Sequence, residues 1–199
     1  MAHHSAVLAA VFALALAAPA AAQTQGPRFM QSIGGGAQWA YPMTGDTGLD
    51  GTPGLTGSWR GWFTPHLGLE AEVGWWTKGQ NFEYHEPGFD ASASARMHAW
   101  SAGANVLGGI PIGRATIVLG GGPAWYHENG SFEAIYNGER QADSLAANHF
   151  GLHSLAELEV HASSRLAIYG AVHAEWRDVK EGIVDSGVVY PTVGLRVRF

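Results

Sequence analysis

The chain has 199 residues, with 17 acidic and 11 basic side chains, 28 glycines, 8 tryptophans and no cysteine. This length fits one domain or two small ones, and the lack of cysteine excludes a disulfide scaffold, a cysteine-ligated zinc site and a thiol nucleophile. A net charge of −6 argues against a nucleic-acid binder, which needs a basic face. Because 46% of the residues are hydrophobic and only 14% are charged, the composition fits a chain whose outer surface does not face water.

The first segment is an export signal by its pattern. Residues 6–18 form an apolar run of about 13 residues, followed by Pro19 and three alanines at 20–22. A membrane-spanning helix needs about 20 apolar residues. We therefore predict a cleaved signal peptide at 1–22 and an exported domain at 23–199.

The rest of the chain alternates between apolar and polar residues with the period of a β-strand. Eight segments show this alternation: 28–42, 54–63, 67–75, 94–109, 114–127, 146–162, 166–176 and 189–199. Short links near 64–66, 110–113 and 163–164 alternate with long polar links near 43–53, 77–93, 128–145 and 177–187. This predicts an all-β fold: an eight-stranded antiparallel transmembrane up-and-down β-barrel with short periplasmic turns and longer extracellular loops.

Tryptophans mark one end of the predicted barrel. The apolar faces of the first, third, fifth and seventh strands end at Trp39, Trp75, Trp125 and Trp176. Aromatic rings prefer the membrane interfaces, so we interpret these four residues as an aromatic girdle. A sandwich core is the alternative, but it gives no reason for all four tryptophans to share one end.

The polar faces of the same strands carry charges that would be costly in contact with lipid. If Phe63 pairs with Leu67 across the turn, Arg60 lies opposite Glu70. We predict an inward-facing ion network that plugs the lumen, made of Arg60, Glu70, Glu72, Glu157, Glu159, His173, Glu175, Arg196 and Arg198.

The C-terminal residues carry a recognisable motif. Thr192, Gly194, Val197 and Phe199 occupy the polar, glycine, hydrophobic and terminal aromatic places of a sequence that resembles the C-terminal β-signal of bacterial outer-membrane proteins. As a pattern, the mature chain resembles the small eight-stranded outer-membrane β-barrels of the OmpA, OmpX and opacity type. The resemblance implies location in the outer membrane, contact with its lipid and lipopolysaccharide, and recognition by the barrel-assembly machinery.

A lipid A-modifying enzyme is the first alternative to a non-catalytic role. Lipid A deacylases, which are similar in size, use a His-x-Ser pair whose two members share a strand face. Here His153 and Ser154 are adjacent and point to opposite sides, while the pair His161 and Ser163 lies at a periplasmic turn. We therefore predict no catalytic residues and no cofactor.

Histidines in the lumen raise the question of a metal. His149 and His153 share an inward face with Glu157, and His173 shares one with Glu175. Positions four apart on a strand lie about 13 Å apart, so a metal would need ligands from neighbouring strands. The register leaves open whether His153 faces Glu175 or His173. We predict histidines that are hydrogen-bonded to carboxylates and no metal.

The long links are acidic. Between residues 43 and 187 they hold twelve carboxylates, against the cations Lys78, Arg140, Arg177 and Lys180. The links also contain aromatic and aliphatic residues, which suit adhesion to an extracellular protein ligand. We predict a non-catalytic outer-membrane barrel of structural or surface-interaction role, and a narrow channel for small solutes is the second alternative.

Overall fold

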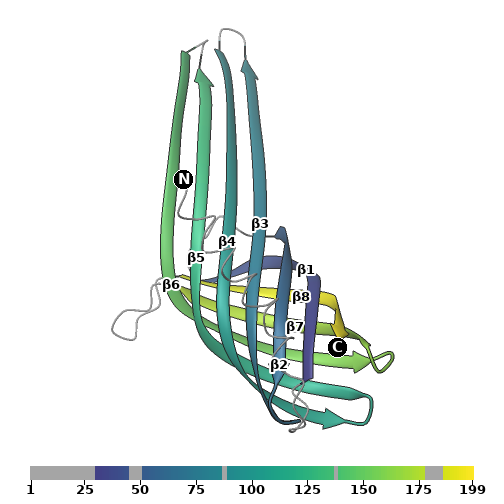
Figure 1. The fold of residues 1–199 in the computed structure, drawn as a ribbon. Helices are drawn as coiled ribbons and strands as arrows, with labels where there is room; N and C mark the ends of the chain where they lie inside the picture. The colour runs from purple at the N-terminus through teal and green to yellow at the C-terminus, as the bar shows by residue number, and fades with distance from the viewer. Residues whose placement is uncertain (1–29, 45–50, 87–88, 137–138, 178–185) are drawn as a thin grey trace.

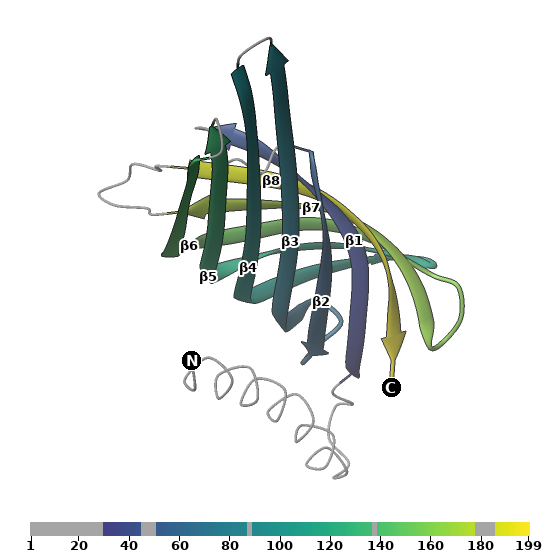
Figure 2. The same ribbon diagram turned by 90° about the horizontal axis from the view of Figure 1, so that it is seen from above.

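The structure is a closed barrel of eight antiparallel strands. The computed structural model describes residues 30–44, 51–86, 89–136, 139–177 and 186–199, and the predicted signal peptide lies outside them. The strands are β1 (Met30–Thr44), β2 (Thr52–Trp62), β3 (Leu67–Glu86), β4 (Phe89–Ile112), β5 (Ala115–Tyr136), β6 (Glu139–His161), β7 (Leu166–Arg177) and β8 (Ser186–Arg198). Each strand pairs with its neighbours in the chain, and β8 closes the ring on β1 (Figures 1 and 2). The predicted fold class is confirmed.

Closure of the barrel fixes the tilt of its strands. One row of paired residues starts at Gln31 and passes through Gly61, Leu69, Val106, Gly121, Ser154, Ala174 and Val189 before it meets β1 again at Tyr41. The row therefore returns ten residues further along β1. Such a stagger means that the strands are inclined to the barrel axis, with an interior that side chains of eight strands can fill.

Side chains alternate between the two faces of the wall. Leu119, Phe150 and Leu195 are exposed on the outside by 53%, 72% and 54%, as expected for a wall that meets lipid rather than water. The interior contains most of the buried polar residues, together with large aromatics that the sequence pattern did not single out. Trp76, for example, lies over Gly74, where a Cβ atom would come within 2.7 Å of the indole ring.

The short turns are fixed by local hydrogen bonds and by one glycine with a positive φ. Thr64 Oγ1 accepts hydrogen bonds from the backbone N–H groups of His66 and Leu67. Ser163 Oγ does the same for Arg165 and Leu166. Hydroxyl side chains commonly stabilise turns in this way. Gly113 has a φ of 60° between β4 and β5, a conformation that favours glycine.

The prediction of long loops at 77–93 and 128–145 is wrong, because most of these residues form strands. Residues 77–86 and 89–93 belong to β3 and β4, and residues 128–136 and 139–145 belong to β5 and β6. Their backbones continue the antiparallel pairing without a break, from Trp76↔Ala99 to Glu86↔Phe89 and from Glu128↔Ala147 to Tyr136↔Glu139. Cross-strand hydrogen bonding stabilises strands here, although both faces meet solvent and the apolar alternation is weaker.

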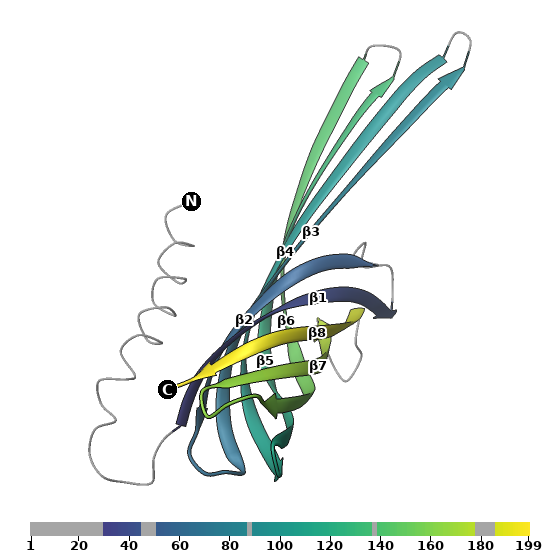
Figure 3. The same cartoon turned by 90° about the vertical axis from the view of Figure 1, so that its right-hand side faces the viewer.

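Four strands are therefore much longer than the other four. β3 to β6 run on together beyond the ends of β1, β2, β7 and β8 and lean away from the barrel (Figures 1 and 3). We call this part the extended sheet: residues 77–86, 89–98, 129–136 and 139–146. Among the described residues, the structure contains no helix with the length and hydropathy to span a membrane.

A charge placed on the outer wall tests which part of the chain meets lipid. Leu119 lies midway along the barrel part of β5, whereas Ile135 lies on the outer face of the same strand in the extended sheet, and both are exposed. We expect Leu119→Arg to lower the free energy of unfolding in lipid vesicles by about 2–4 kcal/mol, the cost of an arginine near the bilayer midplane. The matched control, Ile135→Arg, is expected to change it by about 0.5 kcal/mol or less. Urea titration followed by tryptophan fluorescence measures both, and equal losses would contradict this assignment of the membrane band.

Candidate functional site

The first part of the site is an ion cluster at the short-turn end of the lumen. Arg60 on β2 is fully buried and donates hydrogen bonds to Glu70 on β3 (2.7 Å) and Glu157 on β6 (2.7 Å). The pairing Arg60↔Glu70 follows from the turn, where the Phe63 N–H donates to Leu67 O. The predicted opposition of Arg60 and Glu70 is confirmed.

A second arginine completes this cluster from the other side of the lumen. Arg196 on β8 contacts Glu157 at 3.2 Å, Glu159 at 3.4 Å and Glu70 at 3.5 Å. Arg198 also pairs with Glu159. The short-turn cluster thus consists of Arg60, Glu70, Glu157, Glu159, Arg196 and Arg198. Six predicted residues come together from four strands, with each carboxylate contacting at least one guanidinium.

The remaining predicted residues form a separate cluster further along the lumen. Glu72 on β3, His173 on β7 and Glu175 on β7 are all buried, and His173 Nδ1 lies 3.5 Å from a Glu72 oxygen. The strand register places His153 opposite Glu175, but the ring of His153 contacts His173, with 3.1 Å between Nε2 and Nδ1. The sequence left open whether His153 faces Glu175 or His173. Its backbone pairs with that of Glu175, but its ring contacts His173.

Three further residues of this mid-lumen cluster were missed from the sequence. Tyr190 on β8 donates a hydrogen bond to Glu175 (2.5 Å) and stacks on His173, with ring centroids 5.0 Å apart. Arg177 on β7, predicted as a loop cation, is buried instead and pairs with Glu175 and with Glu128. Asn105 on β4 contacts His153. Period-two alternation alone could have assigned Arg177 and Tyr190 to the inner face.

The predicted girdle and β-signal residues have the expected faces. Trp39 is exposed on the outer wall. The other three predicted girdle residues, Trp75, Trp125 and Trp176, lie on the outward face of their strands and are half-buried. Trp75 lies 6.1 Å from Trp100, a tryptophan that the prediction did not include. On β8, Val197 points outward and Thr192 inward, while the Phe199 N–H donates to Gln31 O beside the barrel seam. Their roles at the membrane interface and in assembly stay predictions.

The second part of the site is the inner face of the extended sheet, which continues the lumen-facing side of the strands. This face carries exposed apolar side chains: Phe82 and Tyr84 on β3, Phe132 and Tyr136 on β5, and Leu145 on β6. Between them lie small residues, since Ala93 pairs with Phe82 and Ala95 with Phe132. A single-layer sheet with an exposed apolar face is a typical protein-binding surface.

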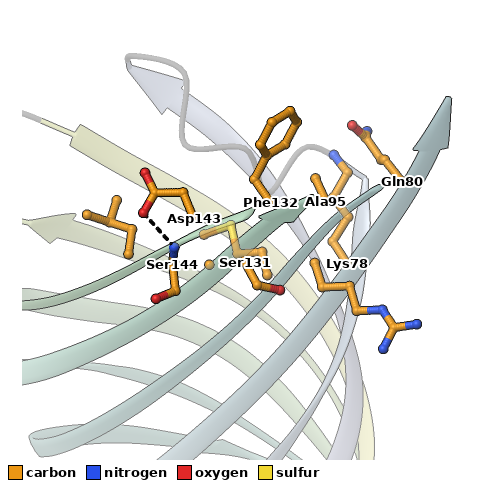
Figure 4. Close-up of a pocket in the computed structure, with 11 residues that line it drawn as sticks. Lys78, Gln80, Ala95, Ser131, Phe132, Asp143 and Ser144 are labelled. Carbon is orange, nitrogen blue, oxygen red and sulfur yellow. Dashed lines mark hydrogen bonds between the residues drawn. The ribbon is translucent and has the colours of Figure 1, made fainter. Parts of the chain in front are cut away.

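A shallow cavity of about 320 Å³ lies on this sheet. It is lined from all four strands, among others by Lys78, Ala95, Phe132 and Asp143 (Figure 4). Met97 and Leu145 also line it, around Gly130. A Cβ atom at Gly130 would meet nothing within 4 Å. The missing side chain therefore leaves a depression between Met97 and Leu145, which flank Gly130 in the strand register.

Removal of one buried charge tests the short-turn cluster. Arg60→Ala leaves Glu70 and Glu157 without their main partner, and breaking a buried ion pair from one side costs about 3–5 kcal/mol. We expect a loss of this size in the free energy of unfolding in detergent micelles. Arg140→Ala is the control, because its pair with Glu133 is solvent-exposed and worth about 1 kcal/mol or less. An equal effect of both substitutions would contradict a structural role of the cluster.

Comparison with known proteins agrees with this architecture. Residues 7–196 match the family described as outer membrane protein beta-barrel domain. No curated protein matches the chain.

Three solved structures resemble the fold at low sequence identity. Ail, the attachment invasion locus protein of Yersinia pestis, is 17% identical (TM-score 0.58), over 86% of this chain and 99% of Ail. A major outer membrane protein from Thermus thermophilus is 13% identical (TM-score 0.59), over 86% and 99% of the two chains. OprG from Pseudomonas aeruginosa is 10% identical (TM-score 0.56), over 86% and 96%. These matches show the fold, and the family match covers most of the sequence: the chain belongs to the family of outer membrane protein β-barrel domains and is located in the outer membrane.

Proposed function

We propose that this protein is a non-catalytic surface-interaction barrel, which binds an extracellular protein through its extended sheet and whose lumen is closed by charged side chains. The observation that carries the proposal is the extended sheet itself, with its exposed apolar inner face. It extends on the side opposite the short turns, which is the extracellular side in barrels of this kind.

The edges of the extended sheet support binding of an extended segment. The register of β3 with β2 ends at Trp76, and the register of β6 with β7 begins at Gly151. Beyond these points no described residue pairs with the free side of β3 or of β6, so the part of the sheet that the structure describes has two edges (Figure 3). An edge strand can accept a partner strand through backbone hydrogen bonds, while side-chain pockets give specificity. The cavity at Gly130, next to β6, would accept an apolar side chain of such a partner.

The charges on the extended sheet indicate which kind of partner would bind there. Among the residues whose side chains the structure describes, the inner face of the extended sheet carries the carboxylates of Glu139 and Asp143 against one cation, Lys78. Ail has been solved in complex with the heparin analogue sucrose octasulfate. A polyanion of that kind is disfavoured on this face, because its two carboxylates outnumber its one lysine and like charges repel. The partner that fits is a protein segment with alternating apolar residues and a neutral or basic charge.

The short-turn cluster supports a closed lumen. Arg60 and Arg196 extend from β2 and β8 to carboxylates on β3 and β6, so their guanidinium groups bridge the interior. An eight-stranded barrel has room for side chains but not for an open pore. These observations favour the surface-interaction role over the narrow channel.

No arrangement of the described residues favours a lipid A-modifying enzyme. His161 lies at the end of β6 beside the short turn, where it contacts Thr116 and Glu159. Ser163 accepts the backbone hydrogen bonds of that turn. The hydroxyl therefore has a structural role and lies at the end of the barrel away from the outer leaflet.

Adhesion assays test the extended sheet. We expect proteoliposomes that contain the wild-type protein to adhere to a surface that carries immobilised peptides of alternating apolar and neutral or basic residues. Phe132→Ser should reduce this adhesion about tenfold, since one buried aromatic contact is worth roughly 1.4 kcal/mol or more. Ile135→Ser is the matched control, because it lies on the opposite face of the same strand and should leave adhesion unchanged. Adhesion that both variants retain would defeat the proposed binding face.

Planar-bilayer recording tests the closed lumen. We expect the wild-type protein to show no conductance above that of a protein-free bilayer, because the ion pairs around Arg60 and Arg196 cross the interior. Reproducible single-channel openings that disappear after heat denaturation of the protein would instead support the channel.

Mass spectrometry tests the enzyme alternative. We expect lipid A from cells with and without the protein to give identical spectra, since no described His and Ser pair has the required placement. A shift by one acyl chain that depends on the protein would establish catalysis.

A further inference from the structure

Three buried side chains from three strands converge in the mid-lumen cluster. One possible ligand atom from each of Glu72 (β3), His153 (β6) and His173 (β7) lies within 4.8 Å of the others. His153 Nε2 and His173 Nδ1 are 3.1 Å apart, and His173 Nδ1 is 3.5 Å from Glu72 Oε1. All three residues are less than a tenth exposed.

The distances between these ligand atoms are similar to those between two ligand atoms of one tetrahedral metal ion. Zinc binds imidazole nitrogen and carboxylate oxygen at about 2.0–2.2 Å, so two ligand atoms of a tetrahedral ion lie roughly 3.3–3.5 Å apart. The two separations in the cluster, 3.1 and 3.5 Å, bracket this range. An ion bound here would take the place of the hydrogen shared between His153 Nε2 and His173 Nδ1, and the His173 ring would then carry its hydrogen on Nε2.

A hydrogen-bond relay fixes the protonation of His153. The Glu70 carboxylate, held by Arg60, accepts a hydrogen bond from Asn105 Nδ2 at 3.5 Å. Asn105 therefore turns its Oδ1 toward His153 Nδ1, at 3.1 Å. Because an amide oxygen only accepts, Nδ1 of His153 carries the hydrogen and its Nε2 presents a lone pair to the cluster. Metal-binding histidines are commonly oriented by such a second partner.

There is also space for a fourth ligand. A cavity of about 10 Å³ is lined by Glu72, His153, Ser101, Glu175 and Tyr190. This is about the smallest cavity that admits one water molecule, and the lining offers polar partners for it. Sites with two histidines and one glutamate characteristically leave one position to water.

We propose that Glu72, His153 and His173 form a binding site for a divalent transition-metal ion of the zinc class inside the barrel. Two imidazoles and one carboxylate favour zinc, copper or nickel over calcium and magnesium, which prefer ligand sets made of oxygen. The inference departs from the sequence expectation of hydrogen-bonded histidines without a metal. Its basis is Glu72, which barrel closure brings to two histidines that follow it by more than eighty residues.

Zinc titration of the intact protein tests the site. The protein is purified in detergent, stripped with a chelator, and refolded with and without zinc chloride. We expect one zinc ion per folded chain by elemental mass spectrometry, and an affinity that falls about 100-fold or more in His153→Gln and His173→Gln. Asn105→Ala keeps all three ligands and should weaken binding about 10–100-fold through loss of orientation. His127→Gln, on the outward face of β5, is the matched control and should bind as wild type.

Cobalt provides a readout that does not depend on the variants. We expect Co²⁺ added to the wild-type protein to give the intense visible absorption of a tetrahedral nitrogen–oxygen site, and excess zinc to abolish it. Gel mobility before and after heating shows which variants fold, and Glu72→Gln replaces a histidine variant that does not. The proposal is overturned if folded wild type retains no zinc, if the His153→Gln and His173→Gln double variant retains the same zinc, or if cobalt gives only the weak octahedral spectrum.

Discussion

The structure depends on one constraint: inside a bilayer, every backbone N–H and C=O group must find a partner within the protein. The seam between β1 and β8 meets that requirement, because it pairs the first and last strands and leaves the barrel without an edge. Closure then divides all side chains into two sets. One set meets lipid, and the other is confined to an interior that is too narrow for bulk water.

Confinement explains why the interior charges form compact clusters. Arg60 and Arg196 come from strands on either side of the seam strand β1, yet both contact Glu157. A carboxylate inside the barrel has little water to solvate it, so guanidinium groups must take that place. The same restriction produces the mid-lumen cluster, where Tyr190 and Arg177 both donate hydrogen bonds to Glu175.

Much of the barrel follows from the sequence, because period-two alternation and turn residues are local signals. The turn at Thr64 sets the register of Arg60 and Glu70 directly. Contacts such as Arg60 with Glu157, or Glu72 with His153 and His173, depend on which strands meet across the interior, and no local pattern carries that information. The extended sheet was missed for another reason: its strands are held mainly by backbone pairing, and polar residues on both faces imitate a loop.

The unequal lengths of the strands affect the thermodynamics of recognition. Flexible loops must lose conformational entropy when a ligand orders them, whereas the inner face of β3 to β6 is already held in register up to Glu86↔Phe89 and Tyr136↔Glu139. Such preorganisation lowers the cost of association. With about 3.3 Å per residue, the ten residues of β3 from 77 to 86 raise this face roughly 30 Å along the strand. The protein thus presents a one-sided platform whose strand pairing is already formed before the proposed partner binds.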